Sequence, residues 1–240
     1  MDVVDALDLP AGEVAPLVRT DLSTRPSLRI GLISDTHIPE ARAELWPQVF
    51  DVFAGVDAIL HGGDIHELFV LDRLGEIAPL WSARGNGEDG SAGRSIAPVD
   101  PRLRYSWRLD LGGVHVGLTH DVPWPEVPPN LTVERWKQRR FGTQDLDVLV
   151  FGDSHVEGIH HVGPTLCVNP GSPTYPRNLN TQLGTLGFLH VTSTGDGTAR
   201  VTAELWQLTE HGADGPTHAS TIDVHRSRTS TPGVDPNQER

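Results

Sequence analysis

Short apolar runs alternate with helix-like stretches over the first half of the chain. Residues 28–33, 56–60 and 79–83 are apolar and of strand length. Pro47 suits the first turn of a helix that runs to about residue 53, and leucines with one isoleucine recur at helical spacing over 66–77. The pattern predicts three strands separated by two helices, with a polar turn after each strand.

Beyond residue 100 the pattern changes to paired strands joined by tight turns. Glycine-containing turns separate apolar runs at three places, which is typical of β-hairpins. An alternating β/α half followed by hairpins predicts two packed β-sheets with helices outside. The predicted strands are 104–111 with 114–119 around Gly112-Gly113, 158–162 with 165–168 around Gly163-Pro164, and 186–192 with 198–208 around Gly195-Asp196-Gly197; a helix over 132–140 and a buried strand over 146–151 lie between the first two hairpins.

The two ends of the chain differ from its middle in composition. Residues 1–27 mix short apolar pieces with three prolines and are predicted to form an N-terminal extension, partly helical and packed on the body. Residues 210–240 are rich in Ser, Thr, Gly, Pro and Asp without apolar periodicity, which predicts a flexible C-terminal tail. Residues 28–209 then form a single domain.

Composition and charge narrow the class of protein. The chain carries 19 Lys and Arg against 32 Asp and Glu, a formal charge of −13, so no stable nucleic-acid complex is expected. A small phosphate substrate is compatible with this charge if cations lie in the site. The single cysteine, Cys167, excludes a disulfide framework and a cysteine-rich zinc site. The sequence contains neither a membrane-length apolar run nor a basic signal-peptide start, so the expected location is the cytoplasm, without membrane association.

Residues able to bind metal ions follow five of the apolar runs. They combine carboxylate oxygen, imidazole nitrogen and amide oxygen, a borderline-hard set that suits Mn, Fe, Zn or Ni better than Ca. Residues i and i+2 of an extended chain point the same way, so an Asp-x-His pair can address one site. Strand carboxyl ends meet at one edge in α/β folds, so the five segments predict one metal centre. The candidate ligands are Asp35 and His37, Asp64, Asn86, His120, and Asp153 with His155.

Six short motifs carry these residues or follow them: Ser34-Asp35-Thr36-His37, His61-Gly62-Gly63-Asp64, Arg84-Gly85-Asn86, Thr119-His120, Gly152-Asp153-Ser154-His155 and Asn169-Pro170-Gly171-Ser172. Over about residues 28–208 the series resembles that of the calcineurin-like metallophosphoesterases. It is most similar to their small single-domain phosphodiesterase branch, which also resembles the metallophosphoesterase-fold scaffold subunit of retromer. The resemblance implies an α/β (α+β) fold, a four-layer sandwich of two mixed β-sheets flanked by helices, with a dinuclear metal centre at one edge.

The resemblance also implies a role for each matching residue. Asp64, Asn86 and His120 would form the catalytic group, and Asn86 would contact the substrate. Arg84 would either contact a phosphate or form a salt bridge, and His61 would orient the loop beneath Asp64. The implied cofactors are two divalent cations, with Mn favoured and Fe, Ni, Zn or Mg as alternatives. The first cation would be held by Asp35, His37, Asp64 and His155, and the second by Asp64 as the bridge, Asn86, His120 and Asp153.

Two positions depart from the family pattern. The family has His at the position of Asp153, so this Asp either binds the second cation directly, which is favoured, or hydrogen-bonds His120 and leaves that cation weakly held. Larger members place a His directly after the motif's Asn to assist leaving-group departure, and Gly87 stands there in this chain. Asp121 is a weak alternative acid because a solvated carboxylate is ionised at pH 7. Without a general acid, hydrolysis would need either a substrate with a good leaving group or a cation-bound water that protonates the leaving group.

The predicted function is hydrolysis of a small phosphodiester by a water that attacks phosphorus in line. Two alternatives remain open: a catalytically weak or inactive scaffold that binds protein partners, and a phosphomonoesterase. The basic helix over 132–140, with Trp124 before it, forms either a solvated face or a rim that holds the rest of the substrate. The oligomeric state is not predicted.

Overall fold

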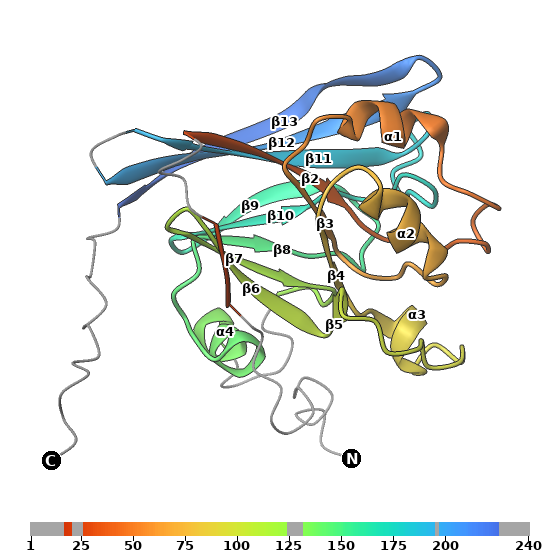
Figure 1. The fold of residues 1–240 in the computed structure, drawn as a ribbon, viewed down its shortest axis with the longest axis horizontal. Coiled ribbons are helices and arrows are strands. Elements are labelled where there is room, and N and C mark those ends of the chain that lie inside the picture. The colour runs from red at the N-terminus through yellow and green to blue at the C-terminus, as the bar shows by residue number, and fades with distance from the viewer. Residues whose placement is uncertain (1–16, 21–25, 124–131, 195–196, 226–240) are drawn as a thin grey trace, which may run out of the picture.

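The computed structural model describes residues 17–20, 26–123, 132–194 and 197–225. These residues form two mixed β-sheets with helices on the outer faces (Figure 1). One sheet has the strand order β1-β6-β7-β8-β10-β9, and the other has the order β13-β12-β11-β2-β3-β4-β5. The predicted four-layer sandwich is confirmed.

The element bounds agree closely with the predicted ones over most of the described chain. The first sheet contains β1 (Leu17–Thr20), β6 (Ser106–Leu111), β7 (Val114–Thr119), β8 (Val148–Val150), β9 (Gly158–Val162) and β10 (Thr165–Asn169). The second contains β2 (Ser27–Ile33), β3 (Ala58–His61), β4 (Leu80–Ala83), β5 (Leu103–Arg104), β11 (Thr185–Ser193), β12 (Thr198–Thr209) and β13 (Gly212–His225). The helices are α1 (Pro47–Phe53), α2 (Phe69–Gly75), α3 (Asn86–Asp89) and α4 (Val133–Phe141).

Strand alternation builds three apolar layers. In β2, Leu28, Ile30 and Leu32 face the core between the two sheets, whereas Ile33 faces the core beneath α1 and α2. Gly31 allows α1 to approach the sheet closely, because a Cβ there would lie 3.0 Å from the Phe53 ring. A third cluster around Trp136 joins α4 to the outer face of the first sheet.

The predicted flexible tail is wrong for residues 212–225. These residues form β13, which pairs antiparallel with β12 over almost its whole length. Backbone pairing needs no continuous apolar run, and Val224 is buried in the core between the sheets. Polar pairs such as Thr202 with Thr221, whose hydroxyls are 2.9 Å apart, cover the solvent face. Residues 226–240 lie outside the described residues.

The predicted N-terminal extension is described only in part. Residues 17–20 form β1, which pairs parallel with β6, so this piece is a strand rather than a helix. Residue 27 already belongs to β2. The remainder of residues 1–27, except Pro26, and the predicted rim residue Trp124 lie outside the described residues.

Parallel strands bring the motif segments to one edge of the sandwich. β2, β3 and β4 are parallel neighbours in one sheet, and β7, β8 and β10 are parallel neighbours in the other. Each of these six strands ends next to one of the six motifs. Because parallel neighbours share a carboxyl edge, the motif side chains meet there.

Candidate metal centre

Six residues at this edge share a backbone conformation that side chains rarely adopt. Among the described residues other than glycine, positive φ angles of 44° to 68° occur only in three Asp-x-His pairs: Asp35 and His37, Asp64 and His66, and Asp153 and His155. Each such residue costs on the order of 1–3 kcal/mol and persists only where the surrounding structure holds it. The concentration of this strain at one edge is typical of a functional site.

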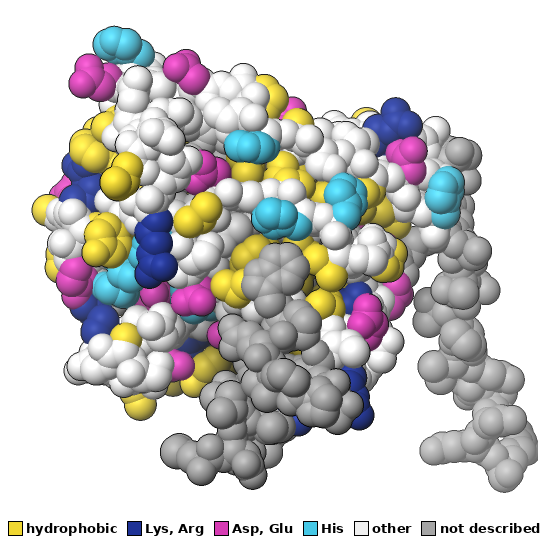
Figure 2. Space-filling view, turned by 180° about the vertical axis from the view of Figure 1, so that it is seen from behind, with side chains coloured by type: hydrophobic (Ala, Val, Ile, Leu, Met, Phe, Trp, Pro, Cys, Tyr) yellow, Lys and Arg dark blue, Asp and Glu magenta, His cyan; other side chains and the backbone are white. Residues whose placement is uncertain are grey.

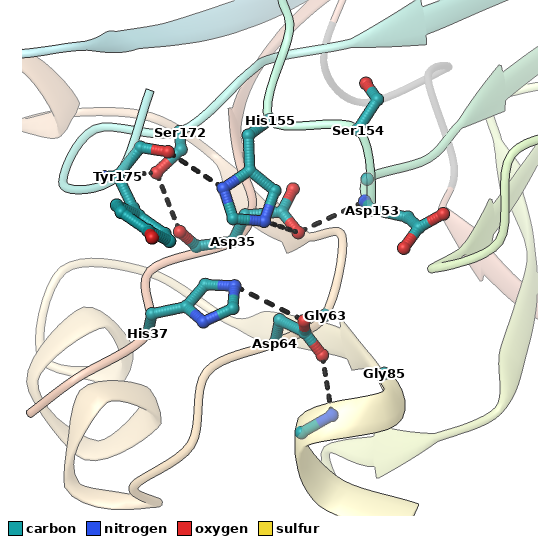
Figure 3. A network of polar contacts seen from close by, with 12 residues as sticks. Asp35, His37, Gly63, Asp64, Gly85, Asp153, Ser154, His155, Ser172 and Tyr175 are labelled. Atoms are coloured by element: carbon teal, nitrogen blue, oxygen red, sulfur yellow. Dashed lines mark hydrogen bonds and ion pairs between the residues drawn. The ribbon is translucent and has the colours of Figure 1, made fainter. Parts of the chain in front are cut away.

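The first group of side chains brings together Asp35, His37, Asp64 and His155. One ligand atom from each lies within 4.8 Å of the others. The Nε2 atom of His37 is 3.3 Å from Asp64 Oδ2, and His155 Nε2 is 3.7 Å from Asp35 Oδ1. Figure 3 shows the four side chains converging, with Asp35 and His37 on one turn and Asp64 and His155 on two others. They are the four residues predicted to hold the first cation.

The second group lies around the Nε2 atom of His120. This atom is 3.2 Å from Asn86 Oδ1, 3.5 Å from Asp64 Oδ1 and 3.7 Å from Asp153 Oδ1. The Asn86 oxygen also lies beside both carboxylate oxygens of Asp64, and a cation would stabilise such a group of acceptors. A rotated amide would instead donate to both oxygens of Asp64, at 3.0 and 2.9 Å. Asp153 is half exposed, and its backbone nitrogen donates to Asp35 Oδ1 at 3.1 Å.

Backbone carbonyls orient the two buried histidines of these groups. His120 Nδ1 donates to Gly62 O and His155 Nδ1 donates to Tyr175 O, both at 2.8 Å. Each ring therefore turns Nε2 toward the carboxylates. This is the usual arrangement of a metal-binding histidine, whose second nitrogen is fixed by an outer partner.

His61 holds the loop that carries Asp64. Its Nδ1 accepts from the Gly63 backbone at 3.1 Å, and its Nε2 donates to the Thr36 hydroxyl at 3.2 Å. Burial, with a smaller contribution from the nearby His120, lowers the pKa of His61 to about 3, so the ring is neutral. Both ring nitrogens face the loops and neither faces the carboxylates.

Glycines make room for the ligand carboxylates. A Cβ on Gly85 would overlap Asp64 Oδ1 and lie 2.8 Å from the Asp64 backbone nitrogen. A Cβ on Gly152 would overlap the Ser34 hydroxyl and lie 2.9 Å from Asp35 Oδ2. These turns therefore require glycine because backbone and carboxylate approach each other closely.

Opposed charges and burial shift the ionisation of the cluster. Burial raises the pKa of Asp35 to about 7, although His120 opposes the shift. Burial disfavours the charged form of His120, but Asp35 and Asp64 outweigh it and raise its pKa to about 9. Burial opposes ionisation of Asp64, yet the nearby His37 and His120 rings and the hydrogen bond from the Gly87 backbone hold its pKa well below the usual range. The protein without cations therefore retains protons on Asp35 and His120 near neutral pH.

Cation binding is accordingly expected to release protons. Below about pH 7 both Asp35 and His120 are protonated in the free protein, and between about pH 7 and 9 His120 alone remains so. Mn²⁺ affinity should rise with pH across this window, by about tenfold per unit where one proton leaves. Titration calorimetry in buffers of different ionisation enthalpy measures the protons released. An affinity that is constant from pH 6 to 9 would contradict the assignment.

Two buried ligand atoms of the first group have unsatisfied hydrogen-bonding capacity that a cation would satisfy. Asp35 Oδ2 and His37 Nε2 are shielded from solvent and have no hydrogen-bond partner. An unpaired buried polar atom costs about 1–3 kcal/mol, and a bound divalent cation would satisfy both. The set of carboxylates, imidazoles and an amide oxygen suits Mn, Fe, Zn or Ni.

Two predicted substrate-handling residues are engaged elsewhere. Arg84 Nη1 donates to the backbone carbonyl of Glu88 at 3.1 Å, and its guanidinium lies 5.8 Å from the centre of the Tyr105 ring. Neither of the roles expected for Arg84, a phosphate contact or a salt bridge, appears in these contacts. Asp121 forms an ion pair with Arg140, so its carboxylate is engaged away from the role of proton donor that the sequence suggested for it.

His66 lies at the cluster although sequence analysis overlooks it. Its Nδ1 is 2.7 Å from Glu40 Oε2, and a Cβ on Gly87 would lie 2.7 Å from its Nε2. Its ring centre is 4.3 Å from that of His37, and burial lowers its pKa. The signal was available: Asp64-Ile65-His66 repeats the Asp-x-His spacing of the two recognised pairs. The predicted helix over 66–77 starts only at Phe69, which leaves His66 in the turn.

Comparison with known proteins identifies the family. Residues 28–195 match the sequence profile of the calcineurin-like phosphoesterase superfamily domain. The chain belongs to this superfamily. Two archaeal relatives are named probable metallophosphoesterases. That of Methanothermobacter thermautotrophicus is 35% identical over 150 residues, 62% of this chain and 78% of the relative. That of Methanocaldococcus jannaschii is 34% identical over 153 residues, 63% of this chain and 71% of the relative.

Solved structures share the fold of this calcineurin-like phosphoesterase. Vacuolar protein sorting 29 from Cryptosporidium parvum has a TM-score of 0.60 at 18% identity, covering 83% of this chain and 99% of that one. Vps29 of Entamoeba histolytica complexed with Zn²⁺ has a TM-score of 0.54 at 20% identity, covering 82% and 99%. At these identities the likeness concerns the fold alone.

Other exposed histidines of this phosphoesterase stand apart from the cluster. Figure 2 shows histidine side chains spread separately over the face seen from behind. His160 and His161 of β9 are exposed, and His161 Nε2 is 2.8 Å from the Ser220 hydroxyl.

No helix in the described part of the chain is both long and apolar enough to cross a membrane.

Proposed function

We propose that this phosphoesterase is a metal-dependent phosphodiesterase with a dinuclear centre. The observation that carries the proposal is the convergence of buried ligand atoms, two of them without hydrogen-bond partners, on the bridging position of Asp64. The first cation would lie among Asp35, His37, Asp64 and His155. The second would lie among Asp64, Asn86, His120 and Asp153.

Bound there, two divalent cations would supply a water of lowered pKa and positive charge for the phosphoryl oxygens. The chain supplies the positioning. Asp64 presents Oδ2 to the first group and Oδ1 to the second, and the Gly87 backbone nitrogen, 2.8 Å from Oδ1, fixes the carboxylate. Asn86 is exposed above the cluster, where its amide can contact a phosphoryl oxygen. Preorganised groups of this kind cost no rearrangement at the moment of reaction.

Charge favours a diester over a monoester. Two divalent cations against the carboxylates of Asp35, Asp64 and Asp153 leave a net charge of about +1. A diester carries one negative charge and a monoester up to two, so the diester matches the cluster better. The guanidinium of Arg140 is paired with the carboxylate of Asp121, so this pair adds no net charge.

The test is turnover with matched substrates. Purified protein with Mn²⁺ is expected to hydrolyse bis(4-nitrophenyl) phosphate faster than 4-nitrophenyl phosphate, and chelation by EDTA should abolish both activities. Faster turnover of the monoester would make the protein a phosphomonoesterase. Cation binding without any turnover would instead favour a non-catalytic binding module of the same fold.

Exchanging Asp153 for His tests how this residue acts. If Asp153 binds the second cation, Asp153→His raises the cluster charge to about +2. Inorganic phosphate should then inhibit several-fold more tightly, and metal preference should shift toward Zn or Ni. Inhibition constants and activity across Mn, Zn, Ni and Mg measure both effects. An unchanged metal profile would mean that Asp153 acts only through His120.

A further inference from the structure

Residues 172–175 form hydrogen bonds with two of the turns that carry ligands of the first group, the turn of Asp35 and the turn of His155. Ser172 Oγ donates to Asp35 O at 2.7 Å, and Thr174 Oγ1 donates to Thr36 O at 2.6 Å. On the other side, His155 Nδ1 donates to Tyr175 O at 2.8 Å. The backbone of residues 172–175 is thus fixed relative to the ligands, as Figure 3 shows for Ser172 and Tyr175.

This fixed segment presents an aromatic ring to solvent beside the cluster. Tyr175 is 58% exposed. Its ring centre is 5.3 Å from that of His155 and 5.6 Å from that of His37, with edge-to-face geometry in both cases. Its hydroxyl has no hydrogen-bond partner among the described residues. The ring therefore packs against two ligand histidines and leaves a large area open to a ligand.

An exposed arginine follows Tyr175 two positions along the chain. The Arg177 backbone nitrogen donates to His155 O at 3.1 Å, and Arg177 is exposed. The first ligand group is therefore flanked by an aromatic surface and a cation, the combination that binds aromatic phosphoesters.

We propose that Tyr175 is the stacking surface for a planar aromatic group on the phosphoester, such as the base of a nucleoside ester. The inference rests on the proposed function, since it needs the phosphate to bind at the cluster. Once the phosphate is there, its ester substituent meets the Tyr175 ring. Because the ring is held on a fixed backbone, little conformational entropy is lost on stacking.

The test compares two ligands that differ only in the base. Calorimetry with Mn²⁺-loaded protein measures binding of adenosine 5′-monophosphate and ribose 5-phosphate. The nucleotide is expected to bind about tenfold more tightly to the wild type, which corresponds to about 1.4 kcal/mol. Tyr175→Phe keeps this ratio and Tyr175→Leu brings it close to one. Tyr175 holds His155 through its backbone carbonyl, so both variants keep that bond.

The controls separate this inference from the proposed function. Val99→Ala removes part of another exposed apolar side chain, 98% exposed, and should leave the ratio unchanged. Equal affinities in the wild type, equal weakening of both ligands in Tyr175→Leu, or no binding of either ligand would overturn the inference. Failure of the protein to hydrolyse diesters would overturn the proposed function and leave the binding ratio readable.

Discussion

Replacing Asp64 with alanine is expected to abolish Mn²⁺-dependent hydrolysis. The Asp64 carboxylate lies between the two ligand groups, 3.3 Å from His37 Nε2 and 3.5 Å from His120 Nε2. Its loss removes the bridge between the two cation positions. Losing several kcal/mol of charge stabilisation corresponds to a fall of about 10³-fold or more in kcat/KM. Initial rates with bis(4-nitrophenyl) phosphate measure the effect.

Asp51 provides a matched control for Asp64. It is an exposed carboxylate in α1, so Asp51→Ala removes the same charge without touching the cluster. Its activity should stay within about twofold of the wild type, because surface substitutions of this kind have small effects. Full turnover by Asp64→Ala with Mn²⁺ present would end the proposed function.

Gly85→Ala is expected to prevent metal binding at the cluster, although Gly85 has no side chain that could bind a metal ion itself. The added Cβ overlaps Asp64 Oδ1 and lies 2.8 Å from the Asp64 backbone nitrogen, so carboxylate and loop must move. A shift of about 1 Å at such a position costs on the order of 10²-fold in rate. Metal content after dialysis and kcat/KM measure the two losses together.

A second glycine separates this effect from general destabilisation. A Cβ on Gly75, at the end of α2, would meet only Arg102 Nη1 at 3.7 Å, an ordinary contact. Gly75→Ala should therefore retain both metal and activity. Circular dichroism should show that Gly85→Ala still folds. Normal metal content and activity in Gly85→Ala would show that Asp64 needs no such close approach.

Much of the fold follows from local pattern, because most strands are apolar on at least one face. Residues 28–33 alternate between two cores, and this alternation is visible in the sequence. Residues 212–225 could not be predicted in the same way. Their pairing rests on backbone hydrogen bonds to β12, with few apolar side chains beneath, and such an edge strand resembles a polar tail.

The candidate site was predictable where spacing carries the information. The Asp-x-His spacing and the position of motifs after strands placed Asp35, His37, Asp64 and His155 together. The roles of the neighbours depend on contacts that sequence does not display. The partner of Arg84 is a carbonyl four residues away, and His66 is held by Glu40 across a turn. The linear pattern also does not reveal the positive-φ turn that places the His66 ring against Gly87.

The most direct test of the central claim is anomalous diffraction from crystals grown with Mn²⁺. The account predicts two anomalous peaks per chain. One should lie among Asp35, His37, Asp64 and His155, and the other beside Asn86 and His120, with Asp64 shared between them. The absence of a peak at the first position, in crystals that contain Mn²⁺ elsewhere, would contradict the account.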